Sequence, residues 1–191
     1  MKILDGKKIS QDIKDELKKL VSNRVANGLK KPHLAAIIVG SDGASLTYVG
    51  SKVRACDYVG YDSTLIQLEE SITEELLLEQ INRLNKDKSV DGFIVQLPLP
   101  KGIDEQKILL AIDPNKDVDG FHPTNFGKMS LEMESFIPAT PYGIIELLDR
   151  YKIETSGKNC VVIGRSNIVG RPVSILLSQK SKKGDATVTL A

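Results

Sequence analysis

The order of apolar segments constrains this chain most, because short apolar runs alternate with amphipathic stretches along nearly all of its 191 residues. Apolar runs predict strands over residues 34–39, 61–68, 93–97, 159–163 and 187–190. Periods near 3.6 residues predict helices over residues 9–21, 45–59, 74–84, part of 102–112, 141–151 and 170–179. Strands that alternate with helices in this way are typical of an α/β fold with parallel sheets.

One segment interrupts the alternation and suggests two domains. Residues 113–141 carry four prolines and no clear period, so we expect irregular structure there. We therefore predict an N-terminal α/β catalytic domain over 1–138 and a Rossmann-like domain over 139–191. Two strands are fewer than a dinucleotide-binding domain needs, so we expect the second domain to be incomplete in this sequence, as if truncated.

The composition excludes some function classes. The formal net charge is +1, from 26 basic and 25 acidic residues, which argues against a broad nucleic-acid surface. Cys56 and Cys160 match no metal-ligand spacing, and we expect free thiols in a reducing compartment. No apolar run approaches the ~20 residues of a membrane span, and the N-terminus shows no signal-peptide pattern. We expect a cytoplasmic protein without membrane or nucleic-acid partners.

A glycine turn follows the strand predicted at 159–163. It reads Gly-x-Ser-x-x-x-Gly-x-Pro from Gly164 to Pro172, which differs from the common dinucleotide pattern. Such glycines let the backbone approach a pyrophosphate at a helix N-terminus, although an ordinary strand–turn–helix explains the spacing equally well. Arg165 could meet a 2′-phosphate and select NADP, or it could be a solvated surface arginine.

Tyr48 and Lys52 are four residues apart, so they share one face of the helix predicted over 45–59. A lysine that is partly desolvated beside an aromatic ring has a lowered pKa and can exchange a proton near neutral pH. The simpler interpretation is an exposed lysine whose stem packs on the tyrosine ring, and the pattern alone favours it.

Two further polar residues stand at or beyond the end of the third predicted strand. Gln96 lies at the carboxyl end of the strand predicted at 93–97, at the edge where open α/β sheets bind ligands. It could orient a lysine or simply bond loop backbone. Asp119 could bond an N–H-rich ring or its own turn. The spacing of Asp117, Asp119 and His122 does not match a metal site, so no metal is expected.

Taken together, these motifs resemble those of the bifunctional methylenetetrahydrofolate dehydrogenase/cyclohydrolases. The resemblance covers essentially the whole chain. The strings that carry it are Tyr48-Val-x-x-Lys52, Gln96-Leu-Pro-Leu-Pro100, Lys116-Asp-Val-Asp119-Gly120, Thr140-Pro141-x-Gly143 and Gly164-Arg165-Ser166-x-x-Val169-Gly170-x-Pro172. The glutamine string and the Lys116 string are the specific ones. Ala139 and Arg54 depart from the family, which commonly has a cysteine and often a second lysine there.

The resemblance implies an activity and a homodimer. The chain would oxidise 5,10-methylenetetrahydrofolate with NADP to the methenyl form and hydrolyse that to 10-formyltetrahydrofolate, within one-carbon metabolism. The hydride would pass directly from the methylene carbon to the nicotinamide, without a metal. The family also continues beyond a strand like 187–190 with segments that are not in this sequence.

The resemblance also implies a role for each site residue. Lys52 would be the catalytic acid and base, and Tyr48 would stack on the folate. Gln96 would hold Lys52 by a hydrogen bond, and Asp119 would anchor the pterin ring. The cofactor would lie against Gly164, Arg165, Ser166 and Gly170, with Arg165 and Ser166 near its 2′-phosphate.

Two other hypotheses remain open from the sequence. The chain could be a non-catalytic fragment that holds folate without converting it. It could also be a different two-domain dehydrogenase, acting for example on shikimate or an amino acid, although the two specific strings count against that.

Overall fold

The computed structural model describes residues 3–191, except the side chain of Ala44. The chain divides into two compact units. The N-terminal unit comprises Ser10–Asp117, and the C-terminal unit comprises Val118–Ala191 together with the residues up to Ile9. The first helix, α1 (Gly6–Ala26), therefore begins in one unit and ends in the other.

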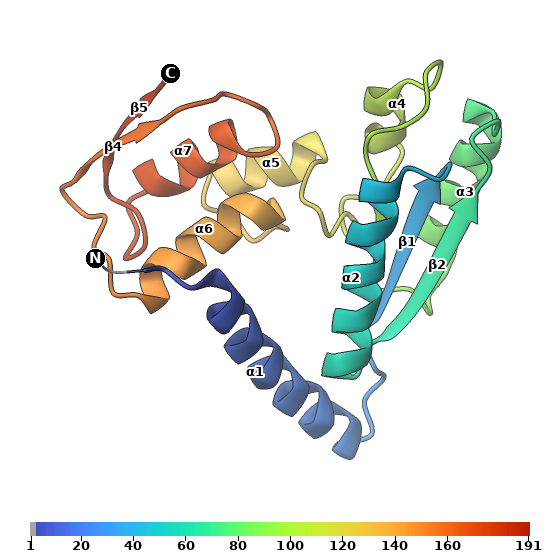
Figure 1. Ribbon diagram of the computed structural model, residues 1–191, viewed down its shortest axis with the longest axis horizontal. Helices are drawn as coiled ribbons and strands as arrows, with labels where there is room; N and C mark the ends of the chain where they lie inside the picture. Colours follow the sequence, from blue (N-terminus) through green and yellow to red (C-terminus); the bar gives the residue numbers. More distant parts are fainter. Residues whose placement is uncertain (1–2) are drawn as a thin grey trace. The chain divides into compact units, whose positions relative to one another are not determined.

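The N-terminal unit is built on a three-stranded parallel sheet (Figure 1). Its strands are β1 (His33–Val39), β2 (Asp62–Leu68) and β3 (Gly92–Val95), in the order β2-β1-β3. The connecting helices are α2 (Gly43–Val59) and α3 (Glu74–Lys86), and the short helix α4 (Glu105–Leu110) follows β3. The central strand β1 is buried over its last five residues, as expected for a strand paired on both sides.

Side chains alternate between the two faces of this sheet. Ala35, Ile37 and Phe93 pack with apolar residues of α3 and α4 in the larger core of the unit. The intervening residues Ala36 and Ile38 point to the opposite face, where α2 lies against β1 and β2 (Figure 1). Because α2 directly follows β1, it begins at the carboxyl edge of the sheet.

The C-terminal unit is a smaller layer of helices on a two-stranded parallel sheet. Its elements are α5 (Pro123–Ser130), α6 (Ala139–Arg150), β4 (Asn159–Val162), α7 (Gly170–Ser178) and β5 (Thr187–Leu190). Met129, Ile145 and Val173 bring α5, α6 and α7 into one core, which also includes inward-facing residues of β4 and β5.

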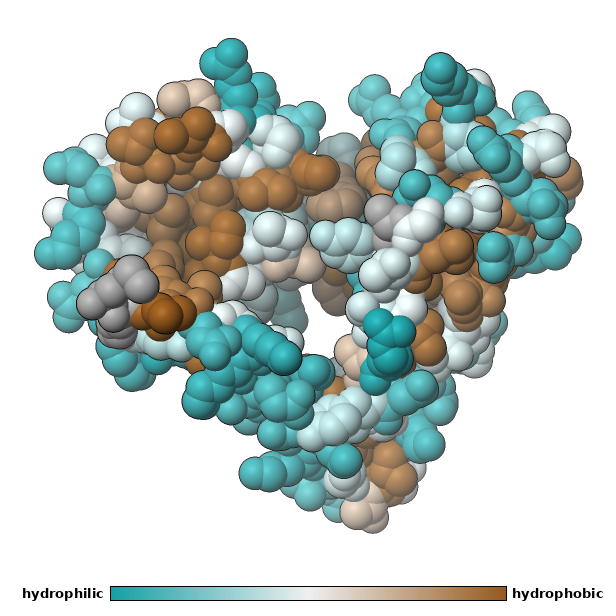
Figure 2. Space-filling model, in the orientation of Figure 1, coloured by the Kyte–Doolittle hydropathy of each residue, from teal (hydrophilic) through white to brown (hydrophobic). Residues whose placement is uncertain are grey.

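The outer face of β4 is apolar and exposed. Figure 2 shows apolar surface in this region, to which Val161 and the following Ile163 contribute. Ile163 is 90% exposed, so this face of the sheet is not covered by the part of the chain that the structure describes.

The predicted α/β class with two domains is confirmed, and all five predicted strands and six predicted helices are present within a few residues of their predicted bounds. The prediction of irregular structure over 113–141 was wrong for α5. Its sequence PTNFGKMS contains poor helix formers, but Pro123 fits a first helical turn and His122 Nδ1 accepts the Thr124 N–H at 3.1 Å. No helix among residues 3–191 is long and apolar enough to cross a membrane.

Candidate active site and nucleotide-binding turn

Lys52 lies on the side of α2 that faces the sheet. Ser45, Val49, Cys56 and Val59 are all buried, and their spacing forms a single stripe along the helix. Lys52 fills the remaining position of this stripe and is half-buried. Its amine makes no hydrogen bond or ion pair within the described residues. A lysine without a partner on an otherwise buried helix stripe is a candidate functional residue.

The neighbours of Lys52 along the helix differ in exposure. Tyr48, one turn earlier, is 66% exposed, so its ring is available to a ligand. Cys56, one turn later, is buried. Burial raises the pKa of the Cys56 thiol and the charge of Asp57 raises it further, so this cysteine stays protonated near neutral pH. This leaves Lys52 as the candidate for proton transfer on this stripe.

Gln96 lies where β3 reaches the carboxyl edge. Its backbone N–H donates to Ile37 O at 2.9 Å and so extends the β1–β3 ladder by one residue. The alternation that directs Ile94 away from the α3 side assigns Gln96 to the same face, the face that carries α2. Its side-chain Nε2 donates to Leu97 O at 2.8 Å. The expected hydrogen bond to Lys52 is absent from this structure, and the role of Gln96 stays a prediction.

The loop after Gln96 is held by α4. Leu99 N–H donates to Glu105 Oε1 at 3.0 Å, and Ile103 N–H donates to Pro100 O at 3.3 Å. The Leu97–Pro98 peptide bond is cis. These contacts give the Gln-Leu-Pro-Leu-Pro string a defined loop conformation at the carboxyl edge of the sheet.

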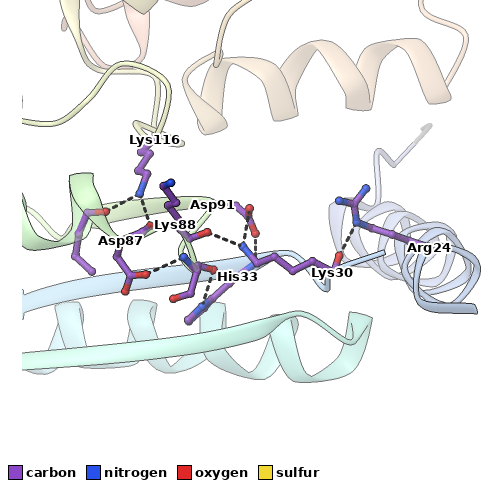
Figure 3. A network of polar contacts seen from close by, with 9 residues as sticks. Arg24, Lys30, His33, Asp87, Lys88, Asp91 and Lys116 are labelled. Carbon is purple, nitrogen blue, oxygen red and sulfur yellow. Dashed lines mark hydrogen bonds and ion pairs between the residues drawn. The ribbon is translucent and has the colours of Figure 1, made fainter. Parts of the chain in front are cut away.

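Lys116 belongs to the second specific string and has a structural task. Its Nζ donates to Leu84 O at 2.7 Å and to Asp87 O at 2.6 Å, at the C-terminus of α3. Figure 3 shows this pair beside a second set of contacts at the start of β1, where Asp91 accepts from Lys30 Nζ and from His33 N–H. Lys116 therefore fixes the segment that precedes Asp119, and sequence reasoning assigned it no role.

Asp119 is half-buried and stands in the C-terminal unit. The next residue, Gly120, has φ of +69°, and a Cβ there would lie 2.8 Å from the backbone of Ile137 and Pro138. Only glycine fits such a close approach, so this turn has one conformation. The predicted role of Asp119 as a ligand carboxylate stays a prediction.

The glycine turn between β4 and α7 is tightly packed. Gly164 has φ of +107°, in the left-handed region, and its N–H donates to Ala191 O at 2.9 Å. A Cβ on Gly170 would lie 1.8 Å from Gly164 O. Both glycines are therefore required, the first by backbone conformation and the second by close approach, as in turns that admit a phosphate.

Arg165 and Ser166 lie within this turn, and Arg171 follows it in the first turn of α7. Ser166 Oγ accepts the N–H groups of Val169 at 3.1 Å and Gly170 at 3.4 Å, where α7 begins. This shapes the turn and leaves the hydroxyl hydrogen able to donate to a ligand. Arg165 is exposed. Arg171, which the sequence reasoning passed over, donates from Nε to Arg165 O at 3.2 Å.

A metal centre and a cavity beside α6 are the other candidate sites. Among residues 3–191, no group of three or more histidine, cysteine, aspartate or glutamate side chains is placed to hold a metal ion. A cavity of about 300 Å³ lies between α6 and the C-terminal end of α7, with Tyr142, Ile145 and Leu176 in its wall. It is at the opposite end of α7 from the glycine turn, so it is not the nucleotide site.

The arrangement defines an α/β protein that pairs a lysine-bearing helix on a parallel sheet with a dinucleotide-type turn. The sequence model of the tetrahydrofolate dehydrogenase/cyclohydrolase catalytic domain matches residues 4–119, and that of the corresponding NAD(P)-binding domain matches residues 138–191. The chain therefore belongs to the tetrahydrofolate dehydrogenase/cyclohydrolase family.

Individual relatives agree with this placement. The chain is 68% identical to the bifunctional protein FolD of Flavobacterium johnsoniae over 190 residues, which covers 100% of the chain and 64% of that protein. The crystal structure of the bifunctional FolD enzyme of Campylobacter jejuni matches with a TM-score of 0.94 at 47% identity, over 100% of this chain and 66% of that one.

A third relative was solved with a bound cofactor. The Trypanosoma brucei enzyme, complexed with NADP and an inhibitor, matches with a TM-score of 0.91 at 35% identity, over 98% of this chain and 63% of that one. The chain thus spans less than two thirds of the length of several of these relatives.

Proposed function

We propose that this chain carries the folate chemistry of its family: oxidation of 5,10-methylenetetrahydrofolate with NADP and hydrolysis of the methenyl product to 10-formyltetrahydrofolate. The observation that carries the proposal is Lys52, a half-buried lysine without a partner on an otherwise buried stripe of α2. Such a lysine is unfavourable for the fold alone, and proton transfer is the work that this placement suits.

In the hydrolysis, Lys52 Nζ moves the proton. Water adds to the methenyl carbon, and the amine takes a proton from that water. The bond from this carbon to N5 then breaks as the added hydroxyl loses its proton to solvent and becomes the formyl C=O, and the amine returns its proton to N5. Tyr48 offers an exposed ring on which the folate stacks, Gln96 orients the amine, and Asp119 accepts hydrogen bonds from the pterin ring.

The turn from Gly164 to Gly170 fits the cofactor. Gly164 and Gly170 let its backbone form a close turn of the kind that admits a phosphate, and the N-terminus of α7 supplies the positive end of the helix dipole. In this proposal Arg165 and Ser166 bind the 2′-phosphate. When bound, NADP supplies the hydride acceptor, and the residues of this chain only bind it and orient it. The NADP in the Trypanosoma brucei relative supports this assignment.

The hydrolysis tests the proposal directly, because it needs no cofactor turnover. The decay of methenyltetrahydrofolate absorbance is followed with the unchanged chain, with Lys52→Met and with Lys86→Met, an exposed lysine of α3 as the matched control. We expect decay above buffer with the unchanged chain and the control, and none with Lys52→Met, whose folding is checked by circular dichroism. Equal decay with Lys52→Met would refute the role of Lys52. Folate binding without decay in the unchanged chain would identify a binding fragment.

Assembly and location are part of the same proposal. The family resemblance supports a homodimer, and light scattering after size-exclusion chromatography would contradict it by giving the mass of one chain. It also supports a cytoplasmic location. A fluorescent fusion that gathered at the cell envelope would contradict that.

A further inference from the structure

Arg171 lies against the nucleotide turn, although no role in ligand binding has been assigned to it. Its backbone N–H donates to Ser166 O at 3.0 Å and its Nε donates to Arg165 O at 3.2 Å. These two donors of Arg171 therefore both reach back to the turn, so the start of the side chain lies along it. The terminal nitrogens of the guanidinium keep their donors for a ligand.

The charged side chains at this turn are both positive. Arg165 and Arg171 are both exposed, and within residues 3–191 neither guanidinium forms an ion pair with a carboxylate. The positive end of α7 adds to them. A phosphate monoester carries about two negative charges near neutral pH, so one arginine neutralises only half of it.

We infer that Arg171 is a second 2′-phosphate-binding residue, which with Arg165 determines the preference of this turn for NADP over NAD. The inference rests on the proposed cofactor function and deepens it. Guanidinium groups form paired hydrogen bonds with phosphate oxygens, so two of them can bind one phosphate from two sides. The hydrogen bond from Nε to Arg165 O limits the freedom of Arg171 before the ligand arrives, which reduces the entropy cost of binding.

Two probes separate phosphate binding from a merely structural role. Adenosine 2′,5′-bisphosphate and 5′-AMP differ only in the 2′-phosphate, so their affinities are compared by calorimetry with the whole 191-residue chain. The variants are Arg171→Gln and Arg171→Lys. Lys180→Gln, an exposed cation beyond the other end of α7, is the matched control for net charge.

We expect Arg171→Gln to weaken 2′,5′-bisphosphate binding about tenfold or more while 5′-AMP binding stays within about twofold. Arg171→Lys should weaken bisphosphate binding less than Arg171→Gln does, and Lys180→Gln should change neither affinity. Equal weakening of both probes would show that Arg171 only holds the turn, and unchanged binding of both would show that it does not contact the phosphate. Either result overturns the inference alone. If the unchanged chain does not bind the bisphosphate at all, the proposed cofactor function fails with it.

Discussion

Replacing Gly170 by alanine tests the structural argument for the nucleotide turn most directly. The new Cβ would lie 1.8 Å from Gly164 O and 2.6 Å from Gly164 C. Contacts of carbon with oxygen need roughly 3 Å or more, so the turn must retreat by over an ångström. Overpacking of this kind costs about 1–3 kcal/mol of stability. A shift of about 1 Å in a binding group costs on the order of a hundredfold in function.

The assay combines two readouts with a matched variant. Urea unfolding gives the stability change, and calorimetry with adenosine 2′,5′-bisphosphate gives the change in affinity. Gly143→Ala is the control, because a Cβ at this helical position meets nothing within 4 Å. Alanine should stabilise α6 there by about 0.5–1 kcal/mol and leave binding unchanged. If Gly170→Ala were as stable as the unchanged chain and bound the bisphosphate normally, the close approach would be wrong.

Two further predictions concern the polar contacts. Lys116→Met removes two charge-assisted hydrogen bonds to α3 and should cost about 2–3 kcal/mol in urea unfolding, whereas a loss below about 0.5 kcal/mol would contradict the anchor. Hydrogen bonds from Arg150, and to a lesser extent from Lys183, hold the pKa of Glu146 below its ordinary value of 4.5. The stability that Glu146 contributes is therefore complete above pH 4.5 and is lost as the pH falls through the lower pKa of the folded state. Glu146→Gln should therefore lower the melting temperature near pH 7 but have little effect at strongly acidic pH, and an equal effect at both would refute the reasoning.

Much of the fold could be predicted from periodicity. Buried strands such as β1 and β3 are short apolar runs, and α3 has a strong apolar face, so local pattern and tertiary role agree. The same approach failed for α5, whose residues favour loops, because its helix depends on packing of Met129 in the core of the C-terminal unit.

Only part of the candidate site could be predicted from the sequence pattern. Spacing placed Tyr48 and Lys52 on one helix face, but only the buried stripe of α2 distinguishes Lys52 from an exposed surface lysine. The contact of Arg171 with Arg165 O depends on how the turn folds back, which no linear pattern states. The domain boundary predicted between residues 138 and 139 remains a prediction. The two compact units divide in sequence between Asp117 and Val118.

The residues before Ser10 belong to the C-terminal unit, and this affects the order of folding. Asp5 N–H is bonded to the Tyr151 hydroxyl at 2.8 Å, across 146 positions of sequence. Asp5 is therefore synthesised long before Tyr151, and its N–H lacks this bond while all of Ser10–Asp117 is made. The N-terminal unit can close early on local contacts, but the start of α1 can be secured only late. In such a chain, a pause or cleavage after the N-terminal unit would leave that unit folded and the start of α1 without its contacts.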